Sequence, residues 1–390
     1  MNTHRRRIVA TIMVCHFIAA FAALGMPPFF ALILDKSLHS EAVYLPGWLY
    51  VVPTFFTAMS SPWWGRMADK YGKKPLLMRA QLGLAASFLL AGFAPNAGVF
   101  VIALALQGLL GGTFAASNAY LATVVSGPAL IQGLTLMQWS ARAALVIAPA
   151  GVGLLMTMES PLELYRYLAL LPLIAALFIG RLPACQVQAV TLASKQRKAE
   201  AIPATSRQVH ALQFAFVFAT VITFPYFIPF IQAGSGSVTP ALAGLLFGLP
   251  HLVYLVCAVP LSRHLGQRDL VFMLLLAYLL LAIALLGQAL FPLLPDVAAW
   301  RVVMGFGMTF GFIGLHALIA RIVSSGNAGR TFGWFESNTK WGAVLAGLIA
   351  GMGVQALDLR APFFIGALTM LAASGYLARL VFHRSRLRNC

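Results

Sequence analysis

Three charged residues lie inside long apolar stretches of the sequence: Arg142 in one, Glu336 and Lys340 in another. A charge at the middle of a membrane is costly, so such residues usually face a protein interior or a pathway rather than lipid. Their spacing of four places Glu336 and Lys340 on one helix face, where they can pair. Two interpretations remain open: Glu336 is a protonation site, or the pair is a structural link between helices.

Bases outnumber acids in this set, because Arg142 and Lys340 accompany the single carboxylate of Glu336. A cavity with surplus positive charge attracts anionic or zwitterionic molecules, and arginine can hold a carboxylate through two hydrogen bonds. This charge balance favours an acidic or zwitterionic organic molecule over a lipophilic cation.

Uncharged or weakly basic polar residues inside apolar stretches are further candidates for a substrate or proton pathway: His16, His251, His316, Asn118, Asn338 and Gln138. Histidine can relay protons, and amides can bind a substrate by hydrogen bonds. The alternative for each is a packing role or a hydrogen bond between helices.

A charged segment from Gly65 to Lys74, Gly-Arg-Met-Ala-Asp-Lys-Tyr-Gly-Lys-Lys, separates two apolar stretches. Gly65 allows two helices to approach closely, and Gly72 permits a tight turn. Asp69 can accept hydrogen bonds from backbone N–H groups at the start of a helix. The alternative is an ordinary basic loop on the cytoplasmic side.

This segment closely resembles the loop between helices 2 and 3 of the major facilitator superfamily, whose spacing Gly65, Asp69, Gly72, Lys73 and Lys74 reproduce. The resemblance implies a secondary transporter of two six-helix halves that alternately exposes a central site to each side of the membrane. The Gly65–Lys74 motif would stabilise one of those states. Within the family, the chain resembles drug:proton antiporter-like exporters.

Composition requires a membrane protein with many helices. The chain has 390 residues, of which 60% are hydrophobic and 9% charged, more apolar sequence than a soluble core can absorb. Its net charge of +17 comes from bases in short loops, so we expect no nucleic-acid partner. The four cysteines have no Cys-x-x-Cys spacing, and we expect neither a metal site nor a cofactor.

We expect an all-α polytopic membrane protein with twelve spans. They lie near residues 8–34, 46–64, 76–95, 98–123, 132–156, 165–184, 209–231, 241–262, 270–290, 299–323, 331–355 and 361–382. The first span follows Arg5–Arg7 and is too long for a signal peptide, so we interpret it as an uncleaved helix. The predicted domains are a six-helix bundle over 1–184, a cytoplasmic linker over 185–208, a second bundle over 209–382 and a basic cytoplasmic tail over 383–390.

Orientation follows from the bases, which a cytoplasmic N-terminus places on the cytoplasmic side. Both termini are then cytoplasmic, and the lack of long extramembrane domains suits a bacterial inner membrane. Leu261–Arg268 looks like a degenerate second copy of the Gly65–Lys74 motif, with Arg263 in the place of Asp69. Paired prolines near the outer ends of spans 1 and 7 predict kinks.

The fourth span contains Leu104-Ala-Leu-Gln107-Gly108, which resembles the family's fourth-helix motif Arg-x-x-Gln-Gly with leucine in place of arginine. A proton-transfer role of that arginine therefore does not carry over to Leu104. Arg301 with Gly305 looks like the repeat-related version in span 10. The alternative is an arginine that extends to the membrane interface.

The fifth span contains Pro149, Gly151 and Gly153. These residues resemble part of a Gly-Pro-x-x-Gly-Gly signature that antiporters of the superfamily use for contact between the two halves. An alternative is helix packing through small residues.

The sequence contains no phosphate-binding loop of the Gly-x-x-x-x-Gly-Lys-Ser/Thr type, so ATP-driven transport by this chain alone is not expected. We therefore expect a proton-coupled exporter that binds a small-molecule substrate, protons and the lipid bilayer, acts as a monomer and is not an enzyme. A nutrient importer of the same fold is the alternative. A non-transporting membrane sensor or a membrane-embedded enzyme is an alternative of another class.

Overall fold

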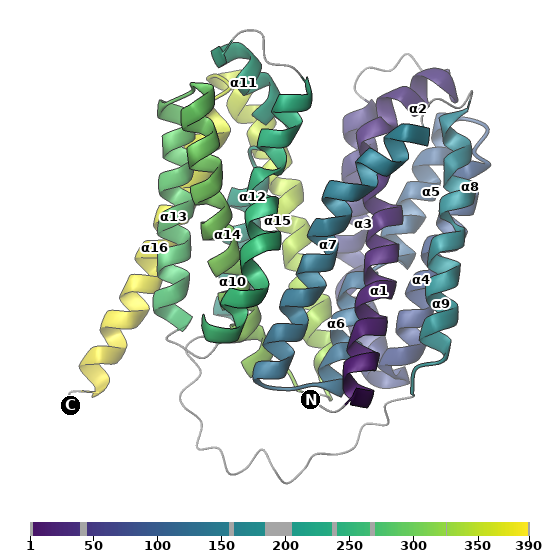
Figure 1. Ribbon diagram of the computed structural model, residues 1–390, viewed down its shortest axis with the longest axis horizontal. Coiled ribbons are helices and arrows are strands. Elements are labelled where there is room, and N and C mark those ends of the chain that lie inside the picture. Colours follow the sequence, from purple (N-terminus) through teal and green to yellow (C-terminus); the bar gives the residue numbers. More distant parts are fainter. Residues whose placement is uncertain are drawn as a thin grey trace. The chain divides into compact units, whose positions relative to one another are not determined.

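The computed structural model describes residues 3–39, 45–155, 160–183, 205–235, 240–265, 270–324 and 326–388. All regular secondary structure in these ranges is helical (Figure 1). The elements in chain order are α1 (Thr3–Gly25), η1 (Pro27–Phe29), α2 (Phe30–Lys36), α3 (Leu45–Tyr71), α4 (Lys73–Gly92), α5 (Ala97–Leu110), α6 (Thr113–Val124), α7 (Pro128–Leu155), η2 (Pro161–Glu163), α8 (Leu164–Leu168), α9 (Leu170–Gly180), α10 (Ser206–Val221), α11 (Phe227–Ser235), α12 (Pro240–Leu265), α13 (Leu270–Leu290), α14 (Leu294–Ile322), α15 (Ala328–Ala356) and α16 (Ala361–Arg388).

Helices occupy all twelve positions at which the sequence predicts a span, and the all-α polytopic fold is confirmed. Within the described residues, eight helical stretches are long and apolar enough to cross a membrane. Three of the other predicted spans correspond to α3, α7 and α15, whose polar residues and prolines lower their mean hydropathy. The remaining predicted span, residues 209–231, is divided between α10 and α11, each of which is shorter than a membrane span.

Four predicted spans are interrupted, the sixth only at Ala169, between α8 and α9. The first ends its regular α-helix at Gly25, continues as a 3₁₀ turn over the paired prolines Pro27 and Pro28, and resumes as α2. The seventh is interrupted between α10 and α11 near Pro225. The fourth, residues 98–123, is split at Gly111 and Gly112, a break that was not predicted from the sequence.

The chain divides into two compact units, residues 1–200 with 323–340, and residues 201–322 with 341–390. The first part of α15 thus packs within the first unit, and its remainder within the second. The predicted division at 184 and 209 remains a prediction, and most of the predicted linker lies outside the described residues.

Each unit has its own helical core. In the first, α1 packs against α7 and α9, while α4 packs against α5 and α9 (Figure 1). A cluster of buried side chains from α1, α2, α4, α5 and α8 includes Phe30, Phe88, Phe100 and Tyr165. In the second, α13 packs against α14 and α16, and α12 against α14.

Candidate functional site

Small residues bring α3 and the first part of α15 into backbone contact. These residues are Ser61 and Gly65 on α3 with Gly329 and Gly333 on α15, and we call them the α3–α15 seam. A Cβ added to Gly333 would lie 2.5 Å from the carbonyl oxygen of Ser61 and 3.1 Å from the Cα atom of Gly65. Glycine is therefore required for this approach, because any larger side chain would meet backbone atoms, which cannot swing aside.

Asp69 closes the cytoplasmic end of the seam, in the predicted orientation. Its carboxylate accepts hydrogen bonds from the backbone N–H groups of Gly329 (2.8 Å) and Arg330 (2.7 Å), in the first turn of α15. It also pairs with Lys73 Nζ at 2.8 Å. An acid at a helix N-terminus satisfies N–H groups that lack partners within the helix and interacts favourably with the helix dipole.

The other residues of the Gly65–Lys74 motif hold the turn that presents Asp69. Gly72 has φ +101°, a backbone conformation that L side chains rarely adopt, and α4 begins directly after it. Lys74 donates to the carbonyl oxygens of Gly180 (2.8 Å) and Leu182 (2.5 Å) at the C-terminus of α9. The motif therefore links three elements: the α3–α4 turn, the start of α15 and the end of α9.

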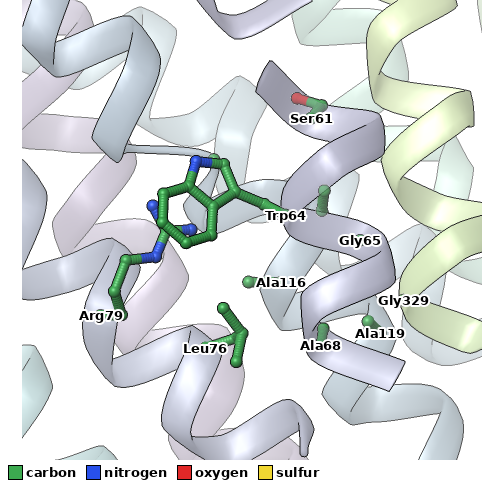
Figure 2. Close-up of a pocket in the computed structure, with 11 residues that line it drawn as sticks. Ser61, Trp64, Gly65, Ala68, Leu76, Arg79, Ala116, Ala119 and Gly329 are labelled. Carbon is green, nitrogen blue, oxygen red and sulfur yellow. The ribbon is translucent and has the colours of Figure 1, made fainter. Parts of the chain in front are cut away.

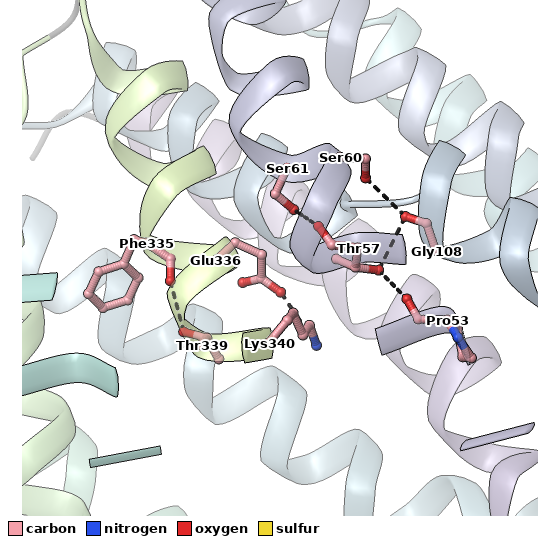
Figure 3. A network of polar contacts seen from close by, with 9 residues as sticks. All are labelled: Pro53, Thr57, Ser60, Ser61, Gly108, Phe335, Glu336, Thr339 and Lys340. Carbon is pink, nitrogen blue, oxygen red and sulfur yellow. Dashed lines mark hydrogen bonds and ion pairs between the residues drawn. The ribbon is translucent and has the colours of Figure 1, made fainter. Parts of the chain in front are cut away.

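At the other end of the seam, α15 presents the two charged residues predicted from the sequence. Ser337 Oγ donates to the carbonyl oxygen of Ala58 at 2.6 Å. One residue earlier, Glu336 pairs with Lys340 at 3.4 Å, with side chains that are 7% and 34% exposed respectively (Figure 3). The acid is thus almost fully buried, while the base remains partly accessible.

Glu336 and Lys340 line a cavity of about 210 Å³ within the first unit, which we call the Glu336 cavity. Its other polar side chains are Thr54 and Thr57 of α3, Gln107 of α5 and Thr113 of α6. The remaining lining residues are apolar, aromatic or glycine: Ala23, Leu24, Pro27, Phe30, Pro53, Leu84, Gly108, Gly111, Gly112, Phe114 and Tyr165. A concave site with an apolar lining and a few polar groups is the usual form of a small-molecule site.

The break between α5 and α6 forms part of the wall of this cavity. Gly112 adopts the left-handed conformation with φ +79°, and α6 begins at the next residue. A break in a membrane helix leaves carbonyl groups without helical donors, which must find partners in the protein because lipid offers none.

Side chains of α3 and α4 supply those partners to three consecutive carbonyls. Thr57 (3.2 Å) and Ser60 (3.3 Å) donate to Gly108, Trp64 Nε1 donates to Leu109 at 2.6 Å, and Arg79 donates to Leu110. The Arg79 guanidinium also lies over the Trp64 ring, 3.5 Å from its centroid (Figure 2). The pair borders a small space of about 20 Å³, with room for about one water molecule. The break is thus held by specific hydrogen bonds.

In the second unit, Arg301 is buried, and its guanidinium also donates hydrogen bonds to backbone carbonyl groups. Pro250 has no N–H group, so it cannot donate to the carbonyl four residues earlier, that of Leu246. Arg301 donates to Leu246 at 3.0 Å and to Phe247, and lies 4.1 Å from the centroid of the Phe227 ring. The interpretation of Arg301 as an arginine that extends to the membrane interface is wrong, because its exposed fraction is 1%.

The other predicted site residues are not among those that line the Glu336 cavity. His16 is buried, with Nδ1 2.7 Å from Ser140 Oγ, and its ring contacts Phe114 of the cavity wall at a centroid distance of 5.0 Å. Asn118, His251 and His316 are buried, whereas Gln138, Arg142 and Asn338 are partly buried. The roles predicted for these residues remain predictions.

The predicted helix-5 motif lies within α7, which runs without interruption through Pro149, Gly151 and Gly153. Gly25 of α1 approaches this part of α7 closely. A Cβ added to Gly25 would lie 2.7 Å from a methyl carbon of Val152 and 3.4 Å from the Cβ of Ala148. Small residues thus allow close contact between α1 and α7, and a role of the motif in contact between the two halves remains a prediction.

Comparison with known protein families identifies the family of this chain. The model of the Major Facilitator Superfamily matches residues 12–294 and 209–389, which together cover most of the chain. The chain belongs to the major facilitator superfamily. It is therefore a membrane transporter and not an enzyme, and the family resemblance inferred from the Gly65–Lys74 motif is confirmed.

Members of the major facilitator superfamily from bacteria match almost the whole chain. Multidrug resistance protein MdtG of Enterobacter lignolyticus (strain SCF1) is 26% identical over 396 residues, which cover 95% of this chain and 91% of that protein. Multidrug resistance protein MdtG of Rahnella sp. (strain Y9602) is 26% identical over 399 residues, which cover 96% and 93%.

Solved structures of superfamily members share the fold. The human organic anion transporter MFSD10 (TETRAN) has a TM-score of 0.80 at 18% identity, and the match covers 96% of this chain and 100% of that one. A bacterial homologue of the iron transporter ferroportin in an outward-facing state has a TM-score of 0.75 at 14% identity, with 96% and 99% covered.

Several residues at the site of this superfamily member were not predicted from the sequence. Thr54 and Thr57 line the Glu336 cavity, and Trp64 and Arg79 hold its broken wall. Arg79 carried a usable signal, because it is a charge inside the predicted third span. The threonines carried none, because a threonine inside a membrane helix most often bonds to its own backbone.

Proposed function

We propose that this transporter works by alternating access and exports a small organic molecule in exchange for protons. The observation that carries the proposal is the position of Glu336, a nearly buried carboxylate that lines a cavity. Among the residues that line this cavity, it is the only carboxylate. A group that binds a proton in one state and contacts substrate or its counter-ion in another couples the two movements.

Lys340 gives Glu336 two distinct arrangements. With Glu336 ionised, the two side chains attract one another across one helical turn. With Glu336 protonated, that attraction is lost and the ammonium group of Lys340 is released toward the cavity. A positively charged group of the substrate that contacts ionised Glu336 then competes with a proton for this carboxylate, which is the requirement for exchange.

The α3–α15 seam would carry the change of state to the cytoplasmic end. All of α15 belongs to the second predicted bundle and α3 belongs to the first, so a movement of one bundle against the other would act on the seam. Asp69 would stabilise the state in which the seam is closed, and its hydrogen bonds to α15 would break in the alternative state. The two six-helix bundles predicted from the sequence are the bodies that would move.

Export, rather than import, is supported by the names of the Enterobacter and Rahnella relatives, which are multidrug resistance proteins. We propose an acidic or zwitterionic substrate, a location in the bacterial inner membrane with both termini in the cytoplasm, and a functional monomer.

The test is transport by the purified chain in proteoliposomes, with a panel of anionic, zwitterionic and cationic metabolites and dyes, with and without an imposed pH gradient. Glu336→Gln removes the titratable group while preserving its shape. Glu163→Gln is the matched control, because Glu163 pairs with Arg166 at 3.6 Å and does not line the cavity. We expect the first variant to lose at least about tenfold of pH-driven transport, equal to about 1.4 kcal/mol in the coupling step. Unchanged pH-driven transport in Glu336→Gln would remove this residue from the mechanism.

A further inference from the structure

The Glu336 cavity carries one acid and one base, Glu336 and Lys340, and no other ionisable acid or base with a charge at neutral pH among its lining residues. An occupant with a net charge would leave that charge without a balancing partner in a site partly shielded from water. Uncompensated charge in such surroundings is costly. An occupant with one positive and one negative group leaves the site neutral and gives each protein charge a partner.

The ion pair is also open to further partners. Its N···O distance is 3.4 Å, whereas a good hydrogen bond between charged groups has a distance of about 2.7–2.9 Å. A carboxylate can accept about four hydrogen bonds and an ammonium group donates three. Within the described part of the chain, this contact is the only polar contact of either charged group. Both therefore keep hydrogen-bonding capacity on the side of the cavity.

The remaining walls are suited to an apolar group. Aromatic and aliphatic side chains, including Phe30, Leu84 and Phe114, line the same cavity. The polar threonines, Thr54 and Thr57, lie on α3, and Thr57 appears near the ion pair in Figure 3. The site thus combines a two-charge surface with an apolar surface, which fits an amphipathic ligand.

We infer that the Glu336 cavity binds a zwitterion whose ammonium and carboxylate groups are as close together as in an α-amino acid, attached to an apolar body. The ligand's ammonium group contacts Glu336 and its carboxylate contacts Lys340. This inference rests on the proposed transport function and narrows its substrate from acidic or zwitterionic to zwitterionic.

Three compounds with one phenylethyl skeleton test this inference: L-phenylalanine, 2-phenylethylamine and 3-phenylpropionate. Equilibrium binding to the purified full chain is measured for each. We expect L-phenylalanine to bind at least about tenfold more tightly than either single-charge compound. Absence of saturable binding of L-phenylalanine, or equal or tighter binding of a single-charge compound, would overturn the inference.

Variants of Glu336 and Lys340 test which of the two residues contacts the ammonium group of the ligand and which contacts its carboxylate. We expect Glu336→Gln to favour 3-phenylpropionate over 2-phenylethylamine, and Lys340→Gln to reverse that preference. Glu163→Gln and Lys36→Gln make the same chemical changes away from the cavity and should leave all three affinities within about twofold. The exchange variant Glu336→Lys/Lys340→Glu retains one acid and one base, so it should keep the preference for the zwitterion. Loss of that preference in the exchange variant, with a normal melting temperature, would contradict the inference.

The outcome separates this inference from the proposed function. Selective binding of L-phenylalanine without any pH-driven movement would overturn proton exchange and leave the zwitterion site intact. Movement of a cationic dye driven by a pH gradient, without binding of L-phenylalanine, would overturn the zwitterion site and leave proton exchange intact.

Discussion

Replacement of Gly333 by alanine gives a sharp test of the α3–α15 seam. The new Cβ would start 2.5 Å from the carbonyl oxygen of Ser61 and must reach at least 3.4 Å for an ordinary contact, a displacement of about 0.9 Å. The displacement must come from separation of α3 and α15, because the opposing atoms are backbone. One turn away in either direction, the hydrogen bonds from Gly329 to Asp69 and from Ser337 to Ala58 would be stretched beyond bonding distance.

Three contributions determine how much Gly333→Ala changes the stability of the closed seam. Overpacking of a tight contact costs about 1–3 kcal/mol. Loss of hydrogen bonds to a charged group adds about 1.5–3 kcal/mol for each bond. Alanine in place of glycine within a helix contributes about 0.8–1 kcal/mol in the stabilising direction. With the Gly329–Asp69 bond as the one lost bond to a charged group, and before the neutral Ser337–Ala58 bond is counted, we therefore expect a net destabilisation of the closed seam by about 1.5–5 kcal/mol.

Gly347→Ala is the matched control, because Gly347 lies in the same helix and a Cβ added there would meet nothing within 4 Å. The melting temperature and hydrogen exchange at the Gly329 and Arg330 amides are measured for both variants. We expect Gly333→Ala to melt at a lower temperature, exchange faster at both amides and transport more slowly. Gly347→Ala should match or slightly exceed the natural chain in stability. Equal melting temperatures and equal exchange in the two variants would refute the reasoning that the seam is a tight backbone contact.

Two further predictions follow from the capping contacts. Asp69→Asn keeps the side-chain shape but removes the charge that the α15 amides and Lys73 contact, and it should lower the free energy of unfolding by about 1.5–3 kcal/mol. Asp296→Asn, in the first turn of α14, is the control. An equal shift of the melting temperature in both variants would argue against a special role of Asp69. Arg301→Met should leave the Leu246 carbonyl of α12 without a donor, at about 1–3 kcal/mol, and remove a second donor from the Phe247 carbonyl. Arg301→Lys should restore little, because one ammonium group lacks the planar fork that reaches both carbonyls, and full stability of the lysine variant would contradict this account.

Local spacing predicted those features of the site that depend on one helix. The interval of four residues placed Glu336 and Lys340 on one face of α15, and they form an ion pair there. The positions of the prolines predicted the interruption after Gly25. Each of these features follows from the geometry of a single segment, so the sequence was sufficient.

Features that depend on partners far apart in the chain could not be predicted. Asp69 was interpreted as an acid that caps a helix start, but nothing in the Gly65–Lys74 motif identifies α15, some 260 residues later, as that helix. The carbonyl of Leu246 that Arg301 contacts is left without a helical donor by a proline in a different helix. The break at Gly111 and Gly112 was visible as a glycine pair, yet the surrounding residues are apolar enough to suggest a continuous span.

Two of the helices without a strongly apolar window, α3 and α15, carry polar residues of the site. Helices α3 and α15 lack a strongly apolar window because they contain prolines, hydroxyl residues and charges, including Asp69, Glu336 and Lys340. In lipid these groups would be costly, but in this chain their partners are other groups of the protein: the α15 amides, the Ala58 carbonyl and the ion pair itself. A membrane helix can therefore contain polar residues where neighbouring groups of the protein satisfy their hydrogen bonds or charges. Low hydropathy of a membrane helix thus indicates contact with other helices. In this chain, that requirement brings α3 and α15 together, and beyond their contact the polar side chains of both helices line the Glu336 cavity with residues of α1, α4, α5 and α6.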